Sequence, residues 1–385
     1  MSRVLIAGAG PVGLTAALVL ARGGVPVTVL EAGPGLATES RASTFHPPTL
    51  EMLADLGVLD ELMAAGIISR TFQYRERSGA VIAELDLSVL ADDTPYPFRL
   101  QCEQSKLTPI LRRHLTALGG EVRFRSPVRG VLPHRGGVVA LTGDGRRDYG
   151  DWLIGADGAH SAVRRSLGIG FEGITYPERF LVASTREDLG VLMPGIAAVN
   201  YVFDPDEWLV LLRTPDHWRV LFPTPDGTPD DQELARLPHR LRGLVDKEWA
   251  VAHASIYRVH QRIATSFRRG RVLLAGDAAH VNNPLGGMGM NSGIHDAVQL
   301  GGALVEVMAG PDDSVVDAVA AVRRDIAATY VQRVSHGNWE RLRSGDPASV
   351  HDELRSLAAD PVRAREHLLR TSMIASLRGP ARDRR

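Results

Sequence analysis

Residues 4–31 read VLIAGAGPVGLTAALVLARGGVPVTVLE, and this stretch decides the fold. The apolar run VLIA at 4–7 predicts a buried β-strand, and PVTVL at 26–30 predicts a second one. The segment between them repeats its apolar residues with the period of a helix. Such a βαβ unit places two parallel strands side by side with the helix packed across them. The N-terminal part of the chain is therefore predicted to be an α/β domain.

Glycines occupy the first turn of this unit in the pattern GxGxxG, at Gly8, Gly10 and Gly13. They permit a tight turn and let the amides of the helix N-terminus approach a pyrophosphate. Glu31 ends the second strand, 18 residues after Gly13, where a carboxylate can accept hydrogen bonds from ribose hydroxyls. The pattern alone is a weak signal. With the strand before it, the helix after it and the acid at this distance, it predicts a dinucleotide site.

Composition limits the class of protein further. With 385 residues, 44% of them hydrophobic, the chain can bury a large core in one domain or in two closely joined ones. A formal net charge of −1 gives no electrostatic reason to bind nucleic acid or an anionic membrane. The single cysteine, Cys102, suits a reducing compartment, and the sequence shows neither a signal peptide nor an apolar run of about 18 residues. We expect a cytoplasmic protein, as a monomer or a homodimer.

Helical and β-rich segments alternate along the rest of the chain. Residues 47–66 and 104–120 have helical periodicity, 171–265 reads as aromatic-rich strands, and helices dominate from 286 to about 376. We predict an α/β fold with an α+β second domain: a Rossmann-like domain is interrupted by a β-sheet substrate domain, and the C-terminus is helical. The predicted limits are 1–70, 98–170 and 266–310 for the first domain, 71–97 and 171–265 for the second, and 311–385 for the C-terminal helices.

A second glycine-rich turn, GDAAHVNNPLGGMGMNSG, occupies residues 276–293. Asp277 follows an apolar run, at the carboxyl end of a predicted strand, where a carboxylate can bind the hydroxyls of a sugar or ribityl chain. The next glycines expose backbone amides as a helix begins, and a helix start stabilises an anion such as a reduced flavin. The residues expected to line that anion are Gly287, Gly289, Met290 and Asn291. A glycine turn that merely packs closely is the alternative.

These two motifs, together with ADGAHSAVR at 156–164, resemble those of the class A flavoprotein aromatic hydroxylases. This group is typified by 4-hydroxybenzoate hydroxylase and 3-(3-hydroxyphenyl)propionate hydroxylase. The resemblance spans essentially the whole chain, with the motifs in the family's order. It implies a Rossmann-like FAD-binding domain, non-covalent FAD as cofactor and NAD(P)H as co-substrate.

The resemblance also implies roles for individual residues. Asp157 marks a segment that binds both FAD and NAD(P)H, Asp277 binds the ribityl chain of FAD, and Arg41 contacts FAD just before a helix. A family glutamine that contacts FAD is matched by Gln104, with Gln101 as the alternative.

One departure from the family pattern lies in the second turn. Many relatives read Pro-Pro-x-Gly-Gly, where this chain has Asn283-Pro284-Leu285-Gly286-Gly287. In the family the carbonyl of the second proline lies by the reactive edge of the flavin, and that proline is retained as Pro284. The resemblance thus implies that Asn283 changes a neighbour of the oxygen site without removing the site.

The activity that the resemblance implies is that of an aromatic-ring monooxygenase. NAD(P)H reduces the flavin, O2 forms a C4a-hydroperoxide, and the distal oxygen is transferred to an activated aromatic or heteroaromatic ring. His46, five residues after Arg41, is a candidate base for phenol deprotonation, because an unperturbed histidine titrates near working pH. A loop histidine with a purely structural role is the alternative.

Substrate-binding residues are expected on the face of the 171–265 sheet that is turned to the flavin. The candidates are Tyr201, Arg213 and His217, with Trp208 and Trp218 beside them. Arg213 has the fork-shaped donor that a carboxylate substrate requires, or it is a solvated strand end. Strand aromatics are more often core residues, and this interpretation stays open for each of them.

Other classes of function remain open: a flavin-dependent oxidase, a halogenase, or a non-catalytic flavin-binding protein of the same fold. Halogenases of this superfamily tend to carry a Trp-x-Trp-x-Ile-Pro segment, which this sequence lacks. His280 and His295 have no third ligand at zinc spacing, so no metal is expected. Residues 32–40 contain no basic side chain that would pair with a 2′-phosphate, which favours NADH over NADPH.

Overall fold

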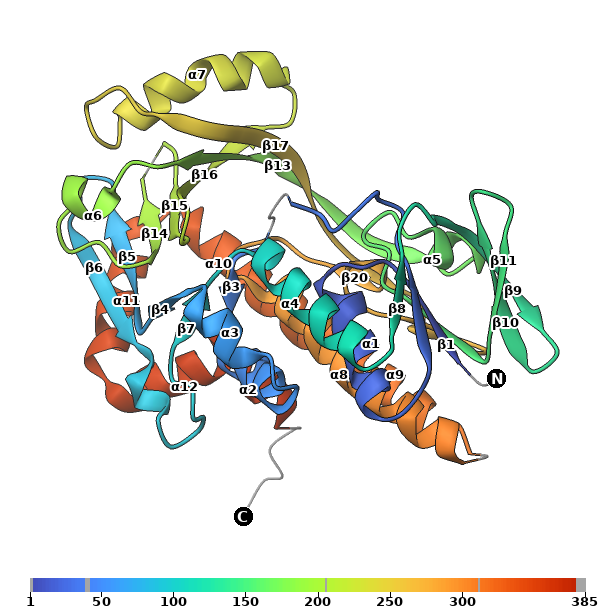
Figure 1. Ribbon diagram of the computed structural model, residues 1–385. Helices are drawn as coiled ribbons and strands as arrows, with labels where there is room; N and C mark the ends of the chain where they lie inside the picture. The colour runs from blue at the N-terminus through green and yellow to red at the C-terminus, as the bar shows by residue number, and fades with distance from the viewer. Residues whose placement is uncertain (1–2, 39–41, 205, 311, 379–385) are drawn as a thin grey trace.

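The computed structural model describes residues 3–38, 42–204, 206–310 and 312–378 (Figure 1). Its first domain is built on a sheet that contains the predicted βαβ unit, in which β1 pairs in parallel with β2 and with β12. Within these residues the sheet has six strands in the order β18-β19-β12-β1-β2-β8, and β18 is its antiparallel edge. Their bounds are β1 Val4–Ala7, β2 Val27–Leu30, β8 Glu121–Arg123, β12 Trp152–Gly155, β18 Arg268–Arg269 and β19 Val272–Leu274. The predicted α/β fold is confirmed.

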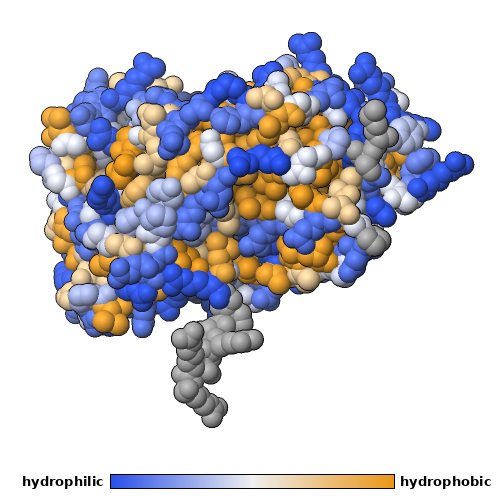
Figure 2. All heavy atoms as spheres, turned by 60° about the horizontal axis from the view of Figure 1, so that its bottom comes forward, coloured by the Kyte–Doolittle hydropathy of each residue, from blue (hydrophilic) through white to orange (hydrophobic). Residues whose placement is uncertain are grey.

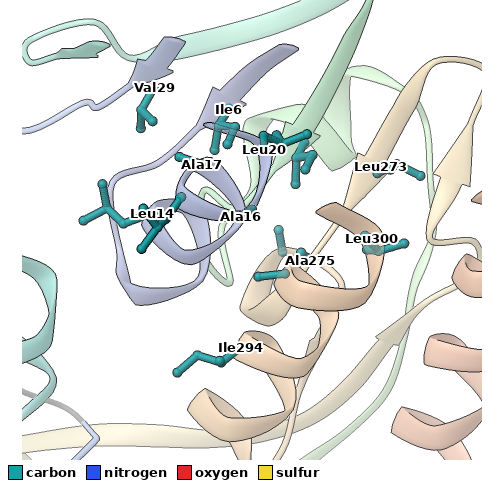
Figure 3. Close-up of a cluster of buried hydrophobic side chains, with 14 of the residues drawn as sticks. Ile6, Leu14, Ala16, Ala17, Leu20, Val29, Leu273, Ala275, Ile294 and Leu300 are labelled. Atoms are coloured by element: carbon teal, nitrogen blue, oxygen red, sulfur yellow. The ribbon is translucent and has the colours of Figure 1, made fainter. Parts of the chain in front are cut away.

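Two helices, α1 (Pro11–Arg22) and α8 (Met288–Ala309), lie side by side against this sheet. Small residues let them approach each other closely, since a Cβ at Gly301 of α8 would lie 3.0 Å from a methyl group of Val19 of α1. Figure 3 shows that side chains from both helices and from the strands meet in one apolar core. The two glycine-rich turns, which precede α1 and α8, are therefore held by the same packed core.

The second domain is built on a larger mixed sheet. Within the described residues it has eight strands in the order β20-β17-β13-β16-β15-β14-β5-β6. Because β20 (His280–Val281) pairs with the end of β17 (Val251–Ala264), this sheet is joined directly to the second glycine-rich turn. The remaining bounds are β5 Thr71–Glu76, β6 Val81–Asp86, β13 Phe171–Thr185, β14 Val199–Phe203, β15 Leu209–Arg213 and β16 Trp218–Pro225. The domain limits expected from the sequence stay a prediction.

Different helices cover the two faces of this sheet (Figure 1). Tyr201 and Val210 lie on one face and pack with Leu285 and with residues of the C-terminal helices. Those helices are α10 Gln332–Leu342, α11 Pro347–Ala359 and α12 Pro361–Thr371, whereas α9 (Ser314–Ile326) packs against α8. The other face packs against α7 (Asp230–Arg242). This helix interrupts the segment 171–265, which the sequence predicts to be rich in strands; its apolar stripe is narrow, and six of its 13 residues are charged.

A small sheet lies between the two domains. Its central strand β7 (Arg99–Gln101) pairs with β3 (Thr44–Phe45) on one side and β4 (Ile67–Ser69) on the other. The helix predicted over 47–66 is broken, because Gly57 adopts a left-handed conformation with φ of +71°. The helices around this sheet are α2 Pro47–Asp55, α3 Leu59–Ala64 and α4 Gln104–Ala117.

The remaining strands, β9 (Val128–His134), β10 (Gly137–Thr142) and β11 (Arg147–Gly150), form an antiparallel sheet beside the first domain. Figure 2 shows the face that lies at the bottom of Figure 1: apolar residues gather over its middle, and hydrophilic residues line its edges. Among the helices of the described ranges, none is both long and apolar enough to span a bilayer.

Candidate active site

The first glycine turn contains three glycines, and they differ in how closely other atoms approach them. Gly8 has φ of +101°, and a Cβ there would lie 2.4 Å from the carbonyl oxygen of Ala156. A Cβ on Gly13 would lie 2.0 Å from the carbonyl oxygen of Gly8. Gly10 differs, because a Cβ there would meet no atom within 4 Å. Gly8 and Gly13 therefore shape the turn, whereas Gly10 leaves it open at the N-terminus of α1.

Glu31 holds this turn in place. Its carboxylate accepts the backbone N–H of Ala9 at 2.6 Å and that of Gly33 at 2.7 Å. Each oxygen keeps further acceptor capacity, so a ribose hydroxyl can also donate to it. The structure thus adds a positioning role to the ribose-binding role expected from the sequence.

The middle motif connects the two glycine turns. Asp157 follows β12 and accepts hydrogen bonds from the Ser161 hydroxyl at 2.6 Å and from the Ala162 N–H at 2.7 Å, at the start of α5 (Ala162–Ser166). Arg164 of the same motif donates to the carbonyl oxygen of Ala278 at 2.8 Å. The motif therefore fixes the turn that contains Asp277.

Asp277 lies in the short 3-10 turn Gly276–Ala278 after β19, and its side chain is exposed. The turn is held from behind by Asp296 of α8, which is fully buried and accepts the N–H of Gly276 at 3.0 Å. Asp296 also accepts hydrogen bonds from His280 at 2.7 Å and from Arg323 at 2.7 Å. The Arg323 and His280 charges outweigh the effect of burial and lower the pKa of Asp296 to about 2.

Sequence reasoning missed Asp296 and Arg323. The signal was an acid 19 residues after Asp277 on the helix expected to follow it, and an arginine on the next helix. Only the packing of α9 against α8 shows that the two charges meet.

The second glycine turn begins with Asn283, which is fully buried. Its side chain accepts the N–H of Leu285 at 3.0 Å and donates to the Tyr176 hydroxyl at 3.0 Å. Pro284 is exposed, and its carbonyl oxygen accepts the N–H of Gly287 at 3.0 Å. Asn283, the departure from the family pattern, is thus a clamp that shapes this loop.

The N-terminus of α8 carries no side-chain cap. Its N-cap is Gly287, with φ of +66°, and its first turn contains no acidic residue. The amides of the first turn of a helix have no partners within the helix, and the helix dipole adds partial positive charge there. Gly289 and Met290 lie in this turn. Asn291 instead has a structural role: it donates to the carbonyl oxygens of Thr44 and Gly287 at 2.8 and 2.6 Å.

His46 precedes α2 and is fully buried against the second glycine turn. Its Nε2 donates to the carbonyl oxygen of Gly286 at 2.8 Å, and its backbone N–H donates to Asn291 at 2.9 Å. Burial first, and then the charge of Arg99, lowers the pKa of His46 from 6.5 to about 3. A histidine with that pKa is a poor base at neutral pH, so the geometry favours the structural alternative, in which His46 holds the loop.

The two glutamine candidates differ in position. Gln101 is fully buried on β7, accepts the Thr44 hydroxyl at 2.9 Å, and leaves its Nε2 without a hydrogen-bond partner. Gln104 is half-buried at the start of α4. Thr44 contacts the Gly287 side of the second turn, so Gln101 faces that turn. Arg41 lies outside the described residues.

The substrate candidates fall on different faces of the large sheet. Tyr201 is buried on the face that packs with Leu285, and its ring stacks on that of Tyr74 with centroids 5.4 Å apart. Arg213 is exposed and pairs across the sheet with Trp218, which faces α7. Arg213 and Trp218 therefore lie on the face opposite to Tyr201 and Leu285, and the structure does not bring the substrate candidates together on one face.

The other two candidates have structural positions. Trp208 is buried and packs edge-on against Phe180 at 5.5 Å, as a core residue does. His217 is half-buried in the turn between β15 and β16, where its backbone N–H donates to the Thr214 hydroxyl at 3.3 Å.

The residues present fit FAD. The first turn is open at Gly10 beside the start of α1, which suits a pyrophosphate. At the second glycine turn, the amide nitrogen of Gln101 has no hydrogen-bond partner and the start of α8 has no side-chain cap. Both features suit a polar ring that becomes anionic. When bound, this cofactor supplies the hydride acceptor and the activation of O2, and the protein supplies position, exclusion of water and electrostatics.

Comparison with known proteins agrees with this geometry. A family model described as "FAD binding domain" matches residues 1–334. The chain is 35% identical over 357 residues to para-nitrophenol 4-monooxygenase of Pseudomonas sp. strain WBC-3, which covers 90% of this chain and 88% of the relative. It is 37% identical over 378 residues to 6-hydroxy-3-succinoylpyridine 3-monooxygenase of Pseudomonas putida, with 95% and 96% covered.

Solved structures show the same likeness. The crystal structure of p-nitrophenol 4-monooxygenase from Pseudomonas putida DLL-E4 matches with a TM-score of 0.91 at 33% identity, covering 96% of this chain and 97% of that one. The chain therefore belongs to the FAD-binding family of class A flavoprotein aromatic hydroxylases. It is an FAD-dependent aromatic-ring monooxygenase.

Proposed function

We propose that this monooxygenase hydroxylates a small, activated aromatic or heteroaromatic ring and that it prefers NADH as reductant. The ring lies between the second glycine turn and the aromatic face of the large sheet. One observation carries this proposal: Leu285, in the middle of the turn, packs in the same buried cluster as Phe72, Tyr74 and Tyr201. The reactive part of the site therefore adjoins an aromatic wall.

The aromatic wall consists of rings from adjacent strands. Phe72 and Tyr74 belong to β5 and Tyr201 to β14, and the Phe72 and Tyr74 rings meet edge to face at 5.7 Å. A flat ring that packs against them gains offset or edge-to-face contacts of about 0.5–1.5 kcal/mol each. The two relatives matched along almost their whole length are named for single-ring substrates, which supports a small ring here as well.

The protein groups near the ring position it and exclude water. The amides at the start of α8 stabilise negative charge on a cofactor that lies across them. Pro284 is exposed in the second glycine turn, and we propose that the reactive edge of the flavin lies beside it. His46 holds the Gly286 carbonyl, which fixes the path of the turn.

The preference for NADH rests on the segment after β2. The described residues 32–38 contain no basic side chain, so a 2′-phosphate finds no charged partner there. Steady-state kcat/KM measured with both nucleotides tests this preference, and a clear advantage of NADPH would refute it.

The ring size is tested by a substrate screen. The FAD-loaded protein is incubated with NADH and with single-ring phenols, pyridinols or a fused four-ring phenol, and both NADH consumption and hydroxylated product are measured. We expect a single-ring compound to give the highest kcat/KM with product formed in step with NADH. A preference for the four-ring compound would overturn the proposal on ring size.

A further inference from the structure

Arg99 of β7 is a buried cation beside the proposed ring site. Its side chain is 3% exposed, yet it makes no ion pair and no hydrogen bond with any described residue, and its Nε is unpartnered. A guanidinium stays charged in proteins, and a buried charge is costly unless it is paired. The buried guanidinium of Arg99 therefore indicates a binding site for a ligand that supplies the missing hydrogen-bond acceptor.

The other buried arginines show how unusual this is. In the described part of the chain each of them has a polar partner. Arg323 pairs with Asp296, Arg240 with Glu233, and Arg179 with Asp230. Arg164 donates to the Ala278 carbonyl and Arg75 to that of Gly79. Among the buried arginines in the described ranges, only Arg99 has an aromatic contact in place of a polar partner: its guanidinium carbon lies 4.2 Å from the centroid of the Phe72 ring.

The register of the small sheet shows which way Arg99 faces. Thr44 and Gln101 are directly paired and share a face, since their side chains are hydrogen-bonded. Arg99 lies two residues from Gln101 on β7, so it points to that same face. Thr44 contacts Gly287 and His46 contacts Gly286. This face is therefore turned to the second glycine turn.

Further cations adjoin the same aromatic wall. Arg341 of α10 hydrogen-bonds Tyr74, and His367 of α12 is buried next to Arg341, Arg370 and Arg99. Burial, and then these three charges, lowers the pKa of His367 to about 3. Among the described residues no carboxylate forms an ion pair with Arg99, Arg341 or Arg370, so the field at the wall is positive.

We propose that Arg99 is the substrate-binding residue for an anionic oxygen on the ring, so that the enzyme selects aromatic anions. A phenolate or an aromatic carboxylate would complete the hydrogen bonds of the guanidinium while its ring packs on Phe72 and Tyr74. A phenolate held in this way is already activated for electrophilic attack and needs no protein base. This inference rests on the proposed function, and it requires no proton transfer to His46.

Ligand binding to the FAD-loaded enzyme, without NADH, tests the proposal. The perturbation of the flavin spectrum gives Kd for two matched pairs: 4-nitrophenolate against 4-nitroanisole, and benzoate against benzamide. The wild-type protein should bind at least one anion more tightly than its neutral partner. Arg99→Met should weaken the binding of that anion roughly ten- to hundredfold, as loss of a charge-assisted hydrogen bond does, and leave the Kd of the neutral partner unchanged. Arg99→Lys should retain part of the preference, and Arg213→Met, on the opposite face, should behave as wild type.

Stability separates this role from a structural one. Because Arg99 has no internal partner, Arg99→Met should leave the thermal stability of the FAD-free protein unchanged or raise it. A substrate-binding role is contradicted if Arg99→Met binds the anion as tightly as wild type, or if neither anion is preferred by the wild type. It is also contradicted if the variant weakens anion and neutral ligand alike. If the anionic substrate is hydroxylated equally well by wild type and Arg99→Met, the anion subsite fails while the proposed ring hydroxylation stands.

Discussion

Gly10 and Gly13 should respond in opposite ways to added side chains, although both belong to one motif. A Cβ on Gly13 would lie 2.0 Å from the backbone oxygen of Gly8, which cannot rotate away. Gly13→Ala should therefore destabilise the FAD-free protein by about 3 kcal/mol, more than the roughly 0.5–1 kcal/mol that alanine gains in a helix. Gly10 has φ of −73° and open space at its Cβ, and serine is at least as good an N-cap as glycine. Gly10→Ser should leave the FAD-free protein as stable as wild type.

Gly10→Ser should instead weaken the binding of FAD. If the pyrophosphate lies over Gly10, the serine side chain occupies its path, and overpacking costs about 1–3 kcal/mol. That cost corresponds to a Kd for FAD roughly five- to 150-fold weaker. Urea unfolding of the FAD-free protein gives the stability, and quenching of flavin fluorescence during titration gives Kd. Gly227→Ser is the matched control, since Gly227 also has open space at its Cβ. FAD affinity of Gly10→Ser equal to that of the control would refute this placement of the cofactor.

Three further changes test other parts of the site. Asp296→Asn should cost about 3–5 kcal/mol of stability, because it leaves Arg323 buried without its counter-charge. It should also weaken FAD binding, because Asp296 holds the Gly276 turn, and unchanged FAD affinity in a folded variant would contradict this effect. Because the pKa of Asp296 falls from 3.8 to about 2 on folding, its contribution to stability is complete above pH 4 and lost as pH falls toward about 2, so wild type but not Asp296→Asn should show that part of the acid transition. His46→Gln should leave the pH dependence of kcat between about pH 5 and 8 unchanged, and a pH-dependent limb of that profile that disappears in the variant would restore His46 as the base. Because the pKa of His46 falls from 6.5 to about 3 on folding, the variant should also lose less stability than wild type as the pH falls below 6.5. Asp277→Ala should reduce FAD retention during gel filtration by removing a charged acceptor of hydroxyl groups, and full retention would remove Asp277 from the site.

Local patterns in the sequence were sufficient for the cofactor domain. The glycines, the strand before them and Glu31 lie within one βαβ unit, whose geometry is short-range and nearly fixed. The second glycine turn could also be predicted from local sequence, because a strand end, glycines and a helix start follow one another directly.

Residues that depend on pairing between distant segments were not predictable in this way. The sequence does not show that Arg213 and Tyr201 lie on opposite faces, because a shift of one residue along a strand reverses every side chain and the register is set by the neighbouring strand. Arg99 lies in the short strand Arg-Leu-Gln, where the sequence alone gives no sign of a binding role. Its missing counter-charge is visible only when segments 44–45, 67–69 and 99–101 come together in one sheet. Asn283 was read as a change near the oxygen site, and its contact with Tyr176 shows a structural clamp instead.

The fate of molecular oxygen tests the central claim most directly. The FAD-loaded enzyme is supplied with NADH, its best ring substrate and 18O2, and the organic product is analysed by mass spectrometry. The account predicts one labelled oxygen atom in each hydroxylated ring, with one NADH consumed for each product formed. Label recovered only as hydrogen peroxide, with no labelled oxygen in the organic product, would make this protein an oxidase and contradict the account.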